Sequence, residues 1–425
     1  MPSDHSRAAR RVAVVSFLFL CEYPLMRSWK ANYAALLVAE TLAMIGFGLS
    51  NPILPLFLEE DIGITDPVKL KAWVGIIQSS SALTLAIFAP IWGHLADTYS
   101  RRAMLLRAMF GGAIVYSLTG FVTSPVQFLI LKAIQGCLTG TVAAATVMVA
   151  GLTPAAQVAF TLGLLQTMIA VGNSLGPLVG GVLADFFGYR PAFFSTGITL
   201  ALAGLVVLKW VDSDKRPVSE TKTKKLSLLP DIRPIKASPL LITVLLVSFM
   251  VNTSTTVISP MLALFLKSLV KTVTDAPAYI GSSTGIVMGV GAACTALAAV
   301  LVGRFSKRFG YWQTLMFCVT AAAVFTFPQT FVTNMYQLTV LRAISSFFIG
   351  GTGPVINAII VVSSDKKHQG TIFGVNSAVS STGQAIGPMI GSLAAMLSYR
   401  TVFMTTAILL GISAWGISWR RRRIS

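Results

Sequence analysis

Charged residues are scarce in this chain of 425 residues: Asp, Glu, Lys and Arg make up 11% of it, and only 15 residues are acidic. Soluble globular proteins carry roughly 25% charged residues. Hydrophobic residues supply 54% of the chain, and the mean hydropathy is +0.75. The shortage of charge excludes an ordinary soluble domain and favours a protein embedded in a lipid bilayer.

Histidine and cysteine are also rare, with three and four copies. Cys21, Cys137, Cys294 and Cys318 lie in apolar stretches, without the paired spacing of a metal site or a disulfide framework. The sequence contains no G-x-x-x-x-G-K-S/T loop for a nucleotide phosphate. We therefore expect no metal, no cofactor, no nucleotide-driven step and no enzyme activity.

Long apolar runs, in contrast, are abundant. A helix that spans a bilayer needs about 20 mostly apolar residues. Twelve stretches meet this requirement: 31–58, 73–96, 104–123, 126–151, 157–184, 191–211, 239–266, 279–302, 311–331, 335–362, 370–397 and 400–419. Several are rich in glycine, as expected where membrane helices pack closely. The sequence predicts an all-α polytopic membrane protein with twelve transmembrane helices.

The net charge of +18 is distributed unevenly between the predicted loops. If both termini are cytoplasmic, most of the 33 Lys and Arg residues fall on the cytoplasmic side. The outer side receives only Lys69, Lys71, Arg190, Lys267, Lys271 and Arg400. This asymmetry follows the positive-inside rule and predicts a multi-pass protein of the cell (inner) membrane with cytoplasmic termini. The terminal "RRRR" indicates a contact with anionic lipid rather than with nucleic acid.

Internal repeats divide the chain into two similar halves. "GHLADTYSRR" from Gly93 returns as "GRFSKRFGYW" from Gly303, and "LKAIQG" around Lys132 returns as "LRAISS" around Arg342, both 210 residues later. The predicted organisation is a cytoplasmic segment 1–30, a six-helix half 31–211, a linker 212–238, a second half 239–420 and a basic tail 421–425. Repeated halves with a central site at their interface are typical of secondary transporters.

The first 25 residues stand apart from this plan. Val12–Cys21 looks like the core of a signal peptide, but no small-x-small cleavage site follows it. We expect either an interfacial helix here or a true start at Met26, and the segment 1–25 to be dispensable.

One carboxylate interrupts an apolar span: Glu40, within "LLVAETLAM". The other acidic residues map to loops, tails or helix ends. An ionised side chain at the centre of a membrane helix costs at least ~2.5–3.5 kcal/mol on insertion scales, and those that persist face a cavity or a partner. Because a glutamate can take up and release a proton, Glu40 is the candidate for proton coupling. The alternative is a structural glutamate that is hydrogen-bonded to a neighbouring helix.

Two cations, Lys132 and Arg342, occupy matching depths in the two halves and predict a cationic outer part of the central cavity. With a rise of 1.5 Å per residue in a hydrocarbon layer of about 30 Å, Glu40 and Lys132 are expected to lie at depths that differ by about 8 Å along the membrane normal. Coupling through water or substrate is therefore more plausible than a direct salt bridge. The candidate cavity residues are Glu40, Lys132, Gln166, Asn252, Arg342 and Asn376.

These motifs resemble the major facilitator superfamily, and within it the twelve-helix drug/proton antiporters, which include bacterial multidrug carriers. The segment "GHLADTYSRR" is close to the family's G-x-L-A-D-R-x-G-R-K, although Thr98 and Ser100 depart from it. "KAIQG" from Lys132 stands where the family has R-x-x-Q-G, and "NPILP" places Pro52 and Pro55 at its paired prolines. In helix 5, "GNSLGPLVGG" is a full match to the element characteristic of antiporters.

The resemblance implies roles for two of these segments. The antiporter element comprises Gly172, Gly176, Pro177, Gly180 and Gly181, whose glycines let backbones approach while the proline favours a kink. A conformational latch is expected at Gly93, Asp97, Arg101 and Arg102. The Asp97 carboxylate would lie at the positive N-terminal end of helix 11, near Gly370, and hold the cytoplasmic side shut in the outward-open state.

Together these features predict a monomeric secondary transporter that exports amphipathic small molecules in exchange for protons by alternating access. Its partners are the substrate, protons and the bilayer. The alternative is an exporter or facilitator dedicated to one physiological solute, such as an organic anion or an amphiphilic metabolite. The two repeated halves and the helix 5 element disfavour a channel or a non-transporting scaffold.

Overall fold

The computed structural model describes residues 29–98, 100–154, 157–212, 238–271, 279–364 and 369–421. These residues are helical almost throughout, and none of them forms a strand. The expectations for segment 1–25, for most of the linker and for the end of the basic tail concern residues outside the described ones.

The helices follow the two predicted halves. The N-terminal half contains α2 (Trp29–Leu49), α3 (Leu54–Glu60), α4 (Pro67–Thr98), α5 (Arg101–Thr119), α6 (Pro125–Leu138), α7 (Thr141–Leu152), α8 (Val158–Phe187) and α9 (Tyr189–Trp210). The C-terminal half contains α11 (Pro239–Ile258), η2 (Ser259–Met261), α12 (Leu262–Lys271), α13 (Ile280–Phe309), α14 (Tyr311–Thr326), η3 (Phe327–Phe331), α15 (Met335–Val362), α16 (Gln369–Leu397) and α17 (Tyr399–Arg421).

Each predicted span coincides with one helical rod in the described part of the chain. Four rods, the first, fourth, seventh and ninth, consist of more than one element: α2 with α3, α6 with α7, α11 with η2 and α12, and α14 with η3. Judged by length and composition, ten of the described rods are long and apolar enough to cross a membrane. The others are α5, which carries three arginines, and α16, which is rich in Ser, Gly and Gln. The all-α membrane fold is confirmed.

A capping residue explains why the second rod begins earlier than the apolar run in the sequence. The second rod begins at Pro67 rather than at residue 73, because Asp66 Oδ1 accepts a hydrogen bond from Val68 N at 2.9 Å. A carboxylate at this position satisfies free backbone donors of the first turn. The scan for apolar residues passed over this turn because it contains Lys69 and Lys71.

The internal repeat is also a structural repeat. Gln127 Oε1 accepts from Thr123 N at 3.0 Å, and Gln337 Oε1 accepts from Thr333 N at 3.1 Å in the equivalent loop. Ser124, directly after Thr123, caps the N-terminus of α6, and Asn334, directly after Thr333, caps the N-terminus of α15. Positions 210 residues apart are therefore spatially equivalent at this corner of each half.

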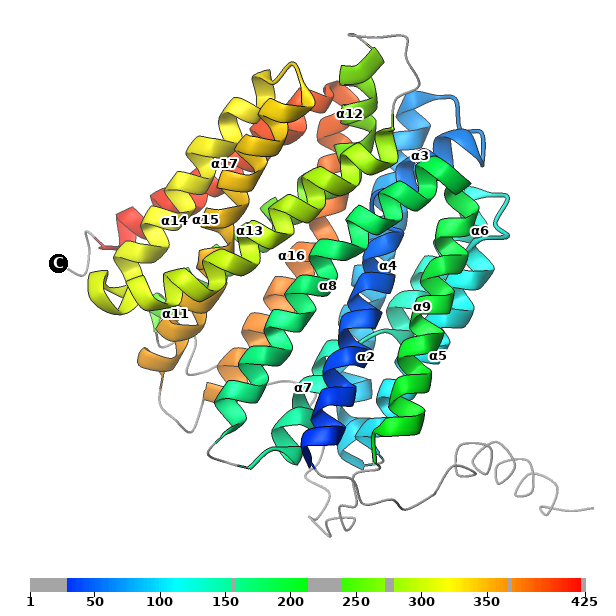
Figure 1. Cartoon of the computed structure of the whole chain (residues 1–425). Coiled ribbons are helices and arrows are strands. Elements are labelled where there is room, and N and C mark those ends of the chain that lie inside the picture. Colours follow the sequence, from blue (N-terminus) through cyan, green and yellow to red (C-terminus); the bar gives the residue numbers. More distant parts are fainter. Residues whose placement is uncertain are drawn as a thin grey trace, which may run out of the picture.

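The two halves join at one end of the bundle (Figure 1). We call the end with the start of α2, the end of α9 and the start of α11 the linker end, and the opposite end, with α3 and α12, the far end. Helix α8 packs against α13, and α4 against α16. Among the described residues, every hydrogen bond and ion pair between halves lies at the far end: Lys71 with Ala395 and Ser392, Asp185 with Gly281 and Ser282, and Lys267 with Glu59 and Glu60.

Candidate functional site

Glu40 lies in the middle of α2 and is completely buried. Its Oε1 accepts a hydrogen bond from Thr141 Oγ1 at 2.9 Å. Its Oε2 is buried and has no partner among the described residues. Loss of a proton from Glu40 therefore creates a buried negative charge to which the described residues donate one hydrogen bond. In this conformation the side chain is closed off from solvent.

Thr141 belongs to an interruption of the fourth rod that the apolar sequence did not reveal. Helix α6 ends at Leu138, Thr139 is extended, and α7 begins at Thr141. Gly140 between them has a φ of 125°, a conformation that residues with a Cβ rarely adopt. The sequence signal is the single glycine in "LTGTV". Glu40 consequently contacts the first residue of a half-helix within the bundle.

The C-terminal carbonyls of α6 at this break are paired with side chains from the second and third rods. Trp92 Nε1 donates to Cys137 O at 2.6 Å, and Arg107 Nη2 donates to Leu138 O at 3.5 Å. The Arg107 guanidinium also stacks on Trp92, 3.5 Å from the ring centroid. Free carbonyls at a helix end need such partners where water is excluded. Sequence reasoning had assigned no role to Trp92 or Arg107.

Lys132 does not contact Glu40 among the described residues. The Lys132 side chain is buried, with Nζ 3.5 Å from Tyr116 Oη and 5.0 Å from the centroid of the Tyr116 ring. Coupling between Glu40 and Lys132 through water or substrate stays a prediction. Tyr116, which the sequence did not single out, is the partner of this cation.

The remaining candidate cavity residues are separated in the fold. Gln166 is exposed on α8. Asn252 on α11 binds α16: its Nδ2 donates to Ser380 Oγ at 3.3 Å, and its Oδ1 accepts from Gln384 Nε2 at 3.2 Å. Asn376 has a buried Oδ1 without a partner among the described residues. Within the described residues, no hydrogen bond or ion pair joins these side chains to Glu40 or Lys132, so the candidate set remains a prediction.

The glycines of the predicted antiporter element lie at helix contacts. A Cβ at Gly172 would lie 2.6 Å from Met44 Cβ, and one at Gly176 would lie 2.7 Å from Gly48 Cα. Gly180 lies even closer to the backbone of Leu49, whereas Gly181 contacts the backbone of Gly281 in the other half. The element therefore packs α8 against α2 on one side and against α13 on the other. Pro177 lies inside α8, which continues past it.

The predicted latch is described only in part. Gly93 and Asp97 lie in the last turns of α4, but what surrounds these two residues and Gly370 is outside the described part of the structure. Arg101 Nη1 donates to Val147 O at 3.1 Å, and Arg102 Nη2 donates to Leu208 O at 2.6 Å. Both arginines thus bind carbonyls of α7 and α9 within their own half.

A carboxylate contacts a helix N-terminus at the far end instead. Asp185, near the end of α8, accepts hydrogen bonds from Gly281 N at 2.9 Å and from Ser282 N at 2.6 Å. These are the first free backbone donors of α13, where the helix dipole also favours negative charge. The sequence marked Asp185 only as a helix-end carboxylate, because its partner lies 96 residues away.

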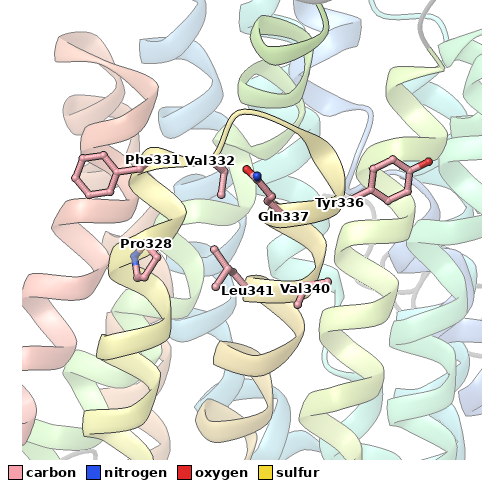
Figure 2. Close-up of a pocket in the computed structure, with 7 residues that line it drawn as sticks. All are labelled: Pro328, Phe331, Val332, Tyr336, Gln337, Val340 and Leu341. Carbon is pink, nitrogen blue, oxygen red and sulfur yellow. The ribbon is translucent and has the colours of Figure 1, made fainter.

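A pocket of about 540 Å³ opens between η3 and the first turns of α15 (Figure 2). Its lining is apolar apart from Gln337 and the Tyr336 hydroxyl, and comprises Pro328, Phe331, Val332, Tyr336, Gln337, Val340 and Leu341. Tyr336 and Phe331 are among the most exposed hydrophobic side chains. The pocket contains no candidate residue and lies in one half only, so we do not assign transport to it.

Within the described ranges, no group of three or more His, Cys, Asp and Glu side chains is arranged to hold a metal ion. Cys137, Cys294 and Cys318 are free thiols, and Cys21 lies outside the described residues.

Comparison with known proteins is consistent across sequence and structure. The profile of the Major Facilitator Superfamily matches residues 36–328 and 272–424. The multidrug resistance protein MdtG of Enterobacter lignolyticus (strain SCF1) is 32% identical over 397 residues, covering 93% of each chain. MdtG of Escherichia coli (strain SMS-3-5 / SECEC) is 32% identical over 408 residues, which cover 95% of this chain and 98% of the relative.

Solved structures share the fold at lower identity. The nucleoside transporter NupG superimposes with a TM-score of 0.74 at 16% identity, covering 91% of this chain and 98% of NupG. A bacterial homologue of the human lysosomal transporter Spinster, in an inward-facing and unoccupied conformation, gives a TM-score of 0.72 at 15% identity over 93% and 97% of the two chains.

Proposed function

This chain belongs to the major facilitator superfamily of secondary transporters, and from that premise we propose that it exports amphipathic small molecules in exchange for protons. The relatives at 32% identity are multidrug resistance proteins, which supports a broad range of amphipathic substrates. We propose that the transporter acts as a monomer in the inner membrane, by alternating access of one central site.

We propose that the linker end is cytoplasmic, because most Lys and Arg residues flank the helices at that end. All described bonds between the halves lie at the opposite end. The described contacts then close the transporter toward the outside, which agrees with loading of an exported compound from the cytoplasm. Asp97 at the linker end is proposed to act in the opposite conformation, when the cytoplasmic ends meet.

The observation that carries the proposal is the hydrogen bond between Glu40 and Thr141. A charged carboxylate accepts a hydrogen bond from the Thr141 hydroxyl group, whereas a protonated carboxyl group can donate one to it. Because Thr141 is the first residue of α7, a change in the proton on Glu40 acts directly on the end of a half-helix. The glycine break at Gly140 leaves α7 free to respond without moving α6 as one rigid rod.

The function is tested in proteoliposomes with an imposed pH gradient and a neutral fluorescent amphiphile, dansyl amide. Glu40→Gln keeps the size of the side chain but cannot exchange a proton, so uphill accumulation should be abolished. Downhill exchange of dansyl amide should continue, which distinguishes lost coupling from a misfolded protein. Glu40→Asp, which keeps the titrating group, is the matched control and should retain part of the accumulation. Full accumulation by Glu40→Gln would contradict the proposal.

A further inference from the structure

Lys132 and Arg342 are equivalent in the repeat, but the structure gives them different surroundings. Lys132 lies beside the hydroxyl and ring of Tyr116. The residue 210 positions after Tyr116 is Thr326, the last residue of α14, whose hydroxyl is buried without a partner among the described residues. The second half therefore lacks the aromatic partner that the first half provides for its cation.

The described residues of the second half include no acidic side chain that could compensate the charge of Arg342. Residues 239–420 contain only two acids, Asp275 and Asp365, and both lie outside the described residues. Within the described residues, the Arg342 guanidinium has no hydrogen bond, ion pair or ring contact. Glu40, the deep carboxylate of the first half, is completely buried against Thr141.

Arg342 lies on the inner side of α15. A Cβ at Gly291 of α13 would lie 3.8 Å from Arg342 Cγ, so the aliphatic stem passes over α13. Helix α13 in turn packs between α15 and α8 of the other half. The neighbouring Val340 is 58% exposed on the outer side of α15. Arg342 itself is half-buried, and the base of its side chain therefore faces α13 rather than the outer side of α15.

We propose that Arg342 is the anchor for the anionic group of a transported amphiphile. A guanidinium remains charged and offers a planar set of donors that matches a carboxylate, sulfonate or phosphonate in two parallel hydrogen bonds. A cation inside a membrane protein without a protein counter-charge needs such a partner or water. This inference rests on the proposed function for the existence of a transported amphiphile, and it assigns the polar end of that amphiphile a negative charge.

The test compares three probes that share one fluorophore and differ in charge: dansylglycine (anionic), dansyl amide (neutral) and dansyl cadaverine (cationic). Binding is measured by fluorescence titration of the full chain in phosphatidylcholine nanodiscs, without a pH gradient. The wild-type protein should bind dansylglycine at least tenfold more tightly than dansyl cadaverine. Arg342→Gln should weaken dansylglycine binding by about tenfold or more, as expected for the loss of a charge-assisted hydrogen bond, and should leave dansyl amide within about twofold.

Two further variants keep the test independent of folding defects. Arg342→Lys retains the charge without the planar fork and should give an intermediate loss. Arg190→Gln removes a cation that pairs with Asp61 at 3.2 Å within the first half, outside the candidate cavity, and should change dansylglycine binding less than threefold. Equal losses in Arg342→Gln and Arg190→Gln, equal losses for all three probes, or no wild-type preference for dansylglycine would overturn the proposal.

The lipid is the other source of an anion, and a second titration separates it. Phosphatidylglycerol is added to the nanodiscs, and dansylglycine binding should persist within about threefold if the site accepts a transported amphiphile. If phosphatidylglycerol abolishes binding to the wild-type protein, the anion site belongs to a lipid headgroup and the proposal fails. Because no gradient is applied, these outcomes are independent of whether Glu40 couples transport to protons.

Discussion

Lys267 of the C-terminal half forms ion pairs with two adjacent carboxylates of the N-terminal half, Glu60 at 2.6 Å and Glu59 at 2.9 Å. Lys267 lies on α12 and both glutamates end α3, so the pairs connect the two helices at the far end. Glu60 also accepts a hydrogen bond from Tyr189 Oη at 2.9 Å. These side chains link the halves in the present conformation and must separate when the far end opens.

Lys267→Gln should therefore increase the population that is open at the far end. Ion pairs that are partly exposed contribute about 0.2–1 kcal/mol each, which corresponds to a shift of up to about fivefold for each of the two pairs. Spin labels at Thr65 and Tyr336, both exposed near the far end, would report a longer distance. Asp61→Asn is the matched control, because Asp61 pairs with Arg190 at 3.2 Å inside one half. Equal shifts in both variants would contradict a cross-half role for Lys267.

Asp185 should contribute to the same closure through the N-terminus of α13. Asp185→Asn keeps an acceptor oxygen but loses the charge, and a charge at a helix terminus contributes about 0.3–1 kcal/mol. Asp185→Ala also loses both hydrogen bonds, so its shift toward the far-end-open state should be clearly larger. Asp66→Ala removes a comparable cap that stays within one half and should not lengthen the same spin-label distance.

Thr141 should be required for efficient coupling. Thr141→Val keeps the shape of the side chain and removes the hydroxyl that donates to Glu40. Since hydrogen bonds to charged groups contribute about 1.5–3 kcal/mol, proton-driven accumulation in proteoliposomes should fall by about tenfold. Thr141→Ser keeps the hydroxyl and should retain most of the activity. A Thr141→Val protein that accumulates substrate at the wild-type rate would show that this hydrogen bond is not part of coupling.

Gly140 should be necessary for the break in the fourth rod. Its φ of 125° is unfavourable for alanine, and such a backbone conformation costs about 1–3 kcal/mol for a residue with a Cβ. Gly140→Ala should therefore lower the thermal unfolding midpoint in detergent. Gly163 of α8, around which nothing lies within 4 Å, offers the control: Gly163→Ala should be neutral or stabilising by up to about 1 kcal/mol. A wild-type midpoint for Gly140→Ala would argue against this account.

The candidate site could be predicted in part. Glu40 stood out because a carboxylate in an apolar span is costly, and the structure supplies a hydrogen-bond partner for it. Thr141, Tyr116 and Arg107 could not be identified as partners, since threonine, tyrosine and arginine near helix ends are common and their contacts depend on other rods. The latch proposed at Asp97 remains a prediction, whereas the carboxylate–helix contact at Asp185 was not anticipated.

The sequence by itself determined the membrane fold and its duplication. Runs of about 20 apolar residues specify bilayer-spanning helices because the backbone must satisfy its own hydrogen bonds in lipid. The repeats at an offset of 210 residues, the glycines of α8 and the paired prolines before and within the first turn of α3 were equally visible, because each depends on local residue types.

Only the tertiary structure decided which end of the bundle is joined and how the two repeated cations differ. Lys132 and Arg342 occur in nearly the same local sequence, yet one lies beside Tyr116 and the other lacks such a neighbour among the described residues. The closure at the far end depends on pairs such as Lys267 with Glu60, which are 207 residues apart. Such contacts are set by the packing of whole helices, and a local sequence pattern contains no information about which distant side chain will face it.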